Sequence, residues 1–227
     1  MSIELAIQGM TFIRSARIGF NAVALALAPL TFPLAEASAH GLEQLEKQLF
    51  EREPYVEFVE KDAPDFALLD AEGRQVTLDG LRGKVVVLHF IYASCPDFCP
   101  LHADKIAEIQ KLVNETPMRE VVEFISITTD PVHDTPDVLR EYGPDHSLDS
   151  YNWRFLTSGM DRPEATRTLA DRYGLKFEPK EEGYILHGLV TFVIEQEGQI
   201  RARFHGLKFN SVNLVLYVNA LVNDVHE

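Results

Sequence analysis

The chain has 227 residues, of which 46% are hydrophobic and 25% are charged, an ordinary composition for a globular protein with a substantial core. It carries 35 acidic and 21 basic side chains, which give a formal net charge of −14. This balance excludes a typical nucleic-acid-binding protein, because contacts to phosphates need clustered Lys and Arg. The acidic surface mainly favours solubility, and it leaves room for a cationic or metal-bearing partner.

Residues 1–39 have the order of an export signal. Arg14 and Arg17 precede an apolar stretch at 18–34, and three small residues at 37–39 follow it. We predict cleavage after residue 39 or, as the alternative, an uncleaved membrane anchor, although one Asn and two Pro make 18–34 a poor spanning helix. Either alternative implies an exported, periplasmic protein, soluble or anchored to the inner membrane, where thiols meet oxidants.

Beyond the signal, residues 40–61 are predicted to form a helical tether, and residues 62–227 one α/β domain. The domain opens with a β-hairpin around the turn 71–73. Apolar runs then alternate with helical spacing, which predicts strands at 85–92, 121–127, 153–156, 185–194 and 200–204, and helices at 100–113, 135–142, 163–173 and 212–222. This order predicts a thioredoxin-like fold, with a central mixed sheet flanked by helices.

The two cysteines of the chain, Cys95 and Cys99, lie between the strand 85–92 and the helix that follows it. Pro100 suits the first helical position, which places Cys99 close to the N-cap. The helix dipole and exposed N–H groups there favour the thiolate, the form that attacks disulfides and binds metals. The pair can therefore hold a soft metal, exchange disulfides or lock a turn.

Two thiolates rarely complete a metal site, so a histidine is the natural third ligand. His89 is expected to be packed within its strand, and His102 to point at the sulfurs or at solvent. His187 lies at the entry to a late strand, in the loop that faces the cysteines in a thioredoxin-like fold. Two thiolates and one imidazole suit Cu(I) or, with a further oxygen ligand, Cu(II) or Zn. A structural role is the alternative for His187.

Taken together, these residues resemble the Sco/SenC family of copper-binding, thioredoxin-like proteins that assist cytochrome c oxidase assembly. Residues 95–100 match the family's Cys-Pro-Asp-x-Cys-Pro in full. Residues 126–135 are similar to its Ser-Ile/Val-Asp-Pro-x-x-Asp-Thr segment, and His187 follows the cysteines at close to the family's spacing. The resemblance covers about residues 62–222.

The resemblance implies three copper ligands, which are Cys95, Cys99 and His187. It also implies that Asp97 shapes or charges the cysteine loop and that Asp130 lies near the site. For Asp130 and for Asp134 the alternative is turn formation and capping of the next helix. The family usually has Asp before the histidine and Ser or Thr after it, whereas this chain has Leu and Gly. Loss of a carboxylate that orients the imidazole weakens metal affinity in other sites.

In function, the resemblance implies a copper metallochaperone, a binding protein rather than an enzyme. It would deliver copper to the subunit of cytochrome c oxidase that carries the CuA site, with a thioredoxin-like reductant or another copper chaperone as a further partner. The alternatives are a thiol-disulfide reductase and a redox or copper sensor, both using the Cys95/Cys99 dithiol. The gap of three residues between the cysteines favours copper, because most thiol oxidoreductases have a gap of two.

Overall fold

A computed structural model of the 227-residue chain describes residues 34–95, 98–180 and 183–224, with side chains for 41–95, 98–176 and 188–224. The predicted export signal therefore lies almost wholly outside the described residues. Within the described part of the chain, no helix combines the length and apolar character required to cross a membrane.

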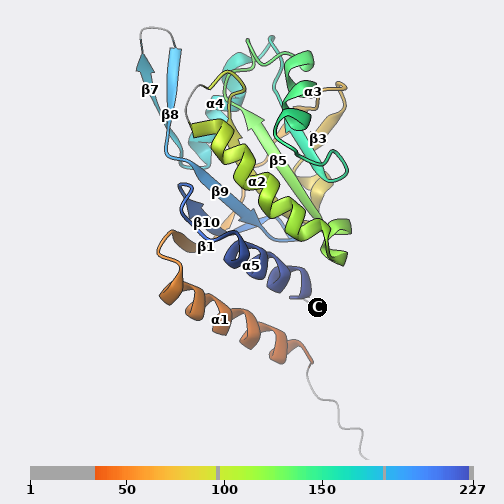
Figure 1. Cartoon of the computed structure of the whole chain (residues 1–227), viewed down its shortest axis with the longest axis vertical. Helices are drawn as coiled ribbons and strands as arrows, with labels where there is room; N and C mark the ends of the chain where they lie inside the picture. The colour runs from red at the N-terminus through yellow and green to blue at the C-terminus, as the bar shows by residue number, and fades with distance from the viewer. Residues whose placement is uncertain (1–33, 96–97, 181–182, 225–227) are drawn as a thin grey trace, which may run out of the picture. The chain divides into compact units, whose positions relative to one another are not determined.

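A six-stranded mixed sheet forms the centre of the fold, in the order β1-β10-β9-β4-β5-β6 (Figure 1). Its strands are β1 (Val56–Asp62), β4 (Val85–Ile91), β5 (Val122–Thr128), β6 (Trp153–Leu156), β9 (Val190–Ile194) and β10 (Gln199–His205). β5 pairs in parallel with β4 and β6, whereas the β4–β9, β9–β10 and β10–β1 pairs are antiparallel. This architecture confirms the predicted α/β class and thioredoxin-like fold.

Helices cover both faces of the sheet, which explains why every residue of β4 and β5 is buried. The α-helices are α1 (Leu34–Arg52), α2 (Phe98–Asn114), α3 (Pro136–Asp145), α4 (Pro163–Arg172) and α5 (Ser211–Asn223), and short 3₁₀ helices span Asp79–Leu81 and Pro117–Glu120. Alternate residues of β4 point to opposite faces, so Val87 and Ile91 join the core under α2 and α5, whereas Leu88 and Phe90 join the core under α4.

Two hairpins stand beside the central sheet. The predicted N-terminal hairpin is present as β2 (Ala67–Leu69) and β3 (Gln75–Thr77). The second pairs β7 (Lys176–Lys180) with β8 (Gly183–His187), and it was not predicted. The single strand expected at 185–194 is divided at Gly188, whose φ of +85° is incompatible with an extended strand.

The segment predicted as a tether contributes to the fold. Leu42 and Leu49 of α1 are buried in the core with residues of α5. The buried Glu53 carboxylate accepts hydrogen bonds from the Asn210 backbone N–H at 2.8 Å and from Asn213 Nδ2 at 2.9 Å. β1 then joins the edge of the sheet beside β10. The sheet therefore begins at Val56, before the boundary expected at residue 62.

Candidate metal centre

The two cysteines lie where β4 gives way to α2, and both stand as thiols rather than as a disulfide. The Cys95 backbone N–H donates to the Tyr92 carbonyl oxygen at 3.2 Å, which tightens the loop after β4. Cys95 is half-buried, whereas Cys99 is only 3% exposed. Asp97 lies outside the described residues, and its role in the loop stays a prediction.

The expectation that the helix start favours the Cys99 thiolate is wrong. α2 begins at Phe98, earlier than predicted, so Cys99 lies inside the first turn and packs into the core. Burial raises the pKa of Cys99 far above its usual value, and a hydrogen bond with the Cys95 side chain raises it further. A backbone hydrogen bond from Tyr92 lowers this pKa, but by less. Cys99 is therefore a thiol at neutral pH, and a metal must displace its proton.

Asp134 ties the segment after β5 to the cysteine loop. Its buried carboxylate accepts hydrogen bonds from the Ala93 N–H, at 3.2 and 3.1 Å to the two oxygens, and from the Thr128 hydroxyl. Burial raises the pKa of Asp134, and these two hydrogen bonds oppose the rise. Asp134 does not cap α3, whose N-cap is Thr135 and has no side-chain cap. The capping alternative is therefore wrong for Asp134.

Asp130 has the turn role that the sequence offered as the alternative. Its carbonyl oxygen accepts the backbone N–H groups of His133 at 3.2 Å and of Asp134 at 2.9 Å. Its carboxylate also contacts His133 Nδ1 at 2.8 Å, in an imidazole that is 74% exposed. Asp130 thus shapes the exposed loop next to Asp134, whose carboxylate is hydrogen-bonded to the cysteine loop.

Two histidines are fully buried between the sheet and α2, with ring centroids 4.7 Å apart. His89 Nε2 contacts Ser126 Oγ at 3.1 Å, and His102 Nε2 contacts Thr191 Oγ1 at 2.8 Å. Burial lowers the pKa of His102 to about 4. Burial and the neighbouring His102 also lower the pKa of His89 well below its usual value. The packed position expected for His89 is confirmed, and His102 faces β9 rather than solvent.

His187 ends β8, where its backbone pairs with Lys176. Its side chain is not among those described, so its role as a ligand stays a prediction. β9 runs antiparallel to β4, with His89 opposite Thr191, and therefore begins at the end of the sheet where β4 ends and the cysteine loop begins. Among the side chains that the structure describes, no three His, Cys, Asp or Glu lie close enough to hold a metal ion.

The family model described as SCO1/SenC matches residues 57–222. This chain belongs to the SCO1/SenC family. An SCO2-like protein of Rickettsia prowazekii (strain Madrid E) is 27% identical to this family member over 146 residues, which are 62% of this chain and 67% of that protein.

Solved structures share the fold of this SCO1/SenC protein. One is BsSco, described as a member of the Sco family of cytochrome c oxidase assembly proteins, with a TM-score of 0.64 and 21% identity over 74% of this chain and 96% of that one. Another is yeast Sco1 with copper bound, with a TM-score of 0.60 and 23% identity over 73% of this chain and 91% of that one.

Sequence reasoning missed part of the candidate site in this SCO1/SenC protein. It placed His102 beside the sulfurs or in solvent, although the spacing of Cys99, His102, Ala103 and Ile106 marks one buried helix face. It also passed over Tyr142 of α3, whose hydroxyl is buried and has no hydrogen-bond partner among the described residues. Burial raises the pKa of Tyr142, and the negative charge that the two nearby cysteines carry once they ionise raises it further.

Proposed function

We propose that this protein is a copper metallochaperone that binds copper through Cys95, Cys99 and His187 and delivers it to the CuA site of cytochrome c oxidase. The observation that carries the proposal is the pair of adjacent thiols at the start of α2, which share a hydrogen bond. Thiolates are soft ligands that select Cu(I), and an imidazole completes a three-ligand set. The start of β9 at the same end of the sheet supports His187 as that imidazole.

The protein's own residues would prepare the site before copper arrives. Asp134 holds the Ala93 amide, so the backbone leading to Cys95 is fixed without the metal. Copper binding releases the proton of Cys99, because that thiol is protonated at neutral pH. Cys95 is the more exposed sulfur and is the one that an incoming ligand of the receiving protein would reach first.

Export forms part of this proposal. Residues 1–39 would direct the chain to the periplasm as a cleaved signal or as an inner-membrane anchor. A dithiol in that oxidising compartment needs a reductant to remain able to bind copper. We therefore infer a thioredoxin-like reductant or a second copper chaperone as a further partner.

A copper titration of the reduced protein tests the ligand set. We expect one Cu(I) per chain, and we expect His187→Ala to weaken binding by at least about tenfold, because it removes a direct ligand. His205→Ala is the matched control, since His205 is half-exposed, contacts Glu57 and lies on β10, which β9 separates from β4. Stoichiometric copper binding whose affinity is unchanged in His187→Ala would refute the three-ligand site.

The same hydrogen bond between the sulfurs favours thiol-disulfide exchange as a second candidate function. Two thiols this close can close to a disulfide and pass two electrons and two protons to a partner disulfide. An insulin reduction assay on the copper-free protein separates the candidates. Robust turnover that is lost in Cys95→Ser would place reductase activity ahead of copper delivery.

A further inference from the structure

The outward side of α2 carries one continuous row of exposed residues that starts beside the cysteines. Spacings of three and four residues place them on one face of the helix. We call this row the α2 stripe, and it consists of Phe98, Leu101, Asp104, Glu108 and Lys111 of α2 together with Glu115, the residue that follows the helix. At 1.5 Å per residue the stripe is about 25 Å long. It therefore runs from the candidate metal centre along the whole helix.

The end of the stripe nearest the metal centre is apolar. Phe98 is 61% exposed and Leu101 is 54% exposed, and they flank Cys99 on the first turn of α2. Adjacent large apolar side chains that remain exposed are typical of surfaces that bind another molecule. These two share the first turn of α2 with Cys99, which lies on the buried face of that turn.

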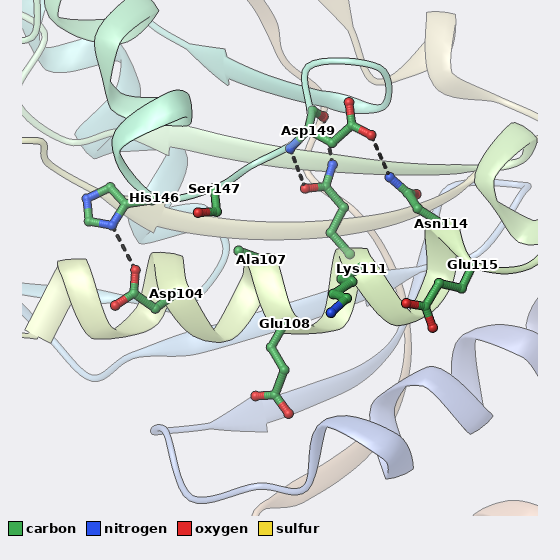
Figure 2. A pocket seen from close by; sticks show the side chains of 10 residues that line it. Asp104, Ala107, Glu108, Lys111, Asn114, Glu115, His146, Ser147 and Asp149 are labelled. Carbon is green, nitrogen blue, oxygen red and sulfur yellow. Dashed lines mark hydrogen bonds and ion pairs between the residues drawn. The ribbon is translucent and has the colours of Figure 1, made fainter.

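The rest of the stripe borders an acidic groove of about 540 Å³ between α2 and the segment after α3 (Figure 2). The groove is lined by six titratable side chains, which are Asp104, Glu108, Lys111, Glu115, His146 and Asp149. Asp104 Oδ1 contacts His146 Nδ1 at 2.9 Å, and Asn114 Nδ2 donates to Asp149 Oδ2 at 3.1 Å. The lining of the groove thus carries four carboxylates and one lysine, and this balance favours cationic groups.

We propose that the α2 stripe is the docking surface for the protein that receives the copper. Its occupant is a protein domain that places an apolar side chain on Phe98 and Leu101 and Lys or Arg side chains along the acidic groove. This inference rests on the proposed function, because ligand exchange requires the two metal sites to touch. The interface must then include the surface around Cys95, the more exposed cysteine, and the α2 stripe begins three residues later at Phe98 and carries a charge that orients the partner.

The test uses the full chain and the copper-free soluble domain that carries the CuA site. Amide chemical shifts of the labelled chain map the contact, and absorbance of the CuA centre follows copper transfer separately. Glu108→Lys/Glu115→Lys reverses the charge of the groove, and Leu101→Ser removes the apolar contact. The matched controls are Glu43→Lys/Glu51→Lys on α1 and Leu216→Ser on α5, since these residues are also exposed.

We expect shifts concentrated in residues 98–115 and about tenfold weaker association for the charge-reversed variant at low salt, with a smaller effect at high salt. Leu101→Ser should weaken association at both salt concentrations, and the controls should stay within about twofold of the wild type. Shifts confined to other elements, no association, or equal losses in the controls would overturn the docking surface. Association through α2 without copper transfer would support the docking surface and refute copper delivery. Copper transfer without chemical-shift changes in α2 would support delivery and refute the docking surface.

Discussion

Acid should destabilise this protein through the two histidines packed between β4 and α2. Burial lowers the pKa of His102 to about 4, from 6.5 for an ordinary imidazole. The unfolded chain therefore takes up this proton first, and the stability that depends on neutral His102 is complete above pH 6.5 and is lost as the pH falls towards 4. Between about pH 7.5 and pH 4.5 these two values give a loss of roughly 2.5 kcal/mol. The lowered pKa of His89 acts in the same direction.

Urea unfolding at a series of pH values measures this loss. His102→Gln removes the titrating imidazole and keeps a side chain that can contact the Thr191 hydroxyl. Over the same pH range, the loss in free energy of unfolding should be smaller in this variant than in the wild type by roughly 2 kcal/mol. His205→Gln is the control, because it replaces a half-exposed histidine that lies outside the core. Parallel losses in the wild type and His102→Gln would refute the reasoning, as would a pKa near 6.5 for His102 by NMR.

The structure also predicts the outcome of four further substitutions. Asp134→Ala leaves a half-buried amide and a buried hydroxyl without their acceptor, and urea unfolding should show a loss of about 3 kcal/mol. A loss below about 1 kcal/mol would contradict this role. Gly143→Ala should cost about 1–3 kcal/mol, because its Cβ would overlap the Trp153 ring, whereas Gly41→Ala in α1 meets open space and should stabilise by about 0.5–1 kcal/mol. Gly188→Ala should cost about 1 kcal/mol through its positive φ alone, although space is available.

The order of elements could be predicted from the sequence because it depends on local patterns. The unbroken apolar run of β4 and the helical spacing within α2 each mark an element without reference to the rest of the chain. Pro136 and Pro163 similarly mark the first residues of α3 and α4. The two cysteines were located by the same reasoning, since they lie at the junction of two such patterns.

Pairing between distant segments could not be predicted in this way. β1 joins the sheet only because β10 lies beside it, and β8 pairs with β7 because Gly188 turns the chain away from β9. Asp134 reaches an amide that lies 41 residues earlier, where a local interpretation offered capping of the next helix. Hydrogen bonds of this kind depend on which segments the fold brings together.

The sequence by itself determined the dithiol, its position between a buried strand and a helix, and the class of chemistry that two nearby thiols allow. The tertiary structure decided the protonation state of Cys99, because burial depends on the side chains that close around the first turn of α2. It likewise decided that His102 is a buried neutral residue facing β9, and that the exposed row on α2 runs from the turn that carries Cys99 to an acidic groove. Local spacing sets the order of the residues, but only packing sets their exposure to water and hence their charge.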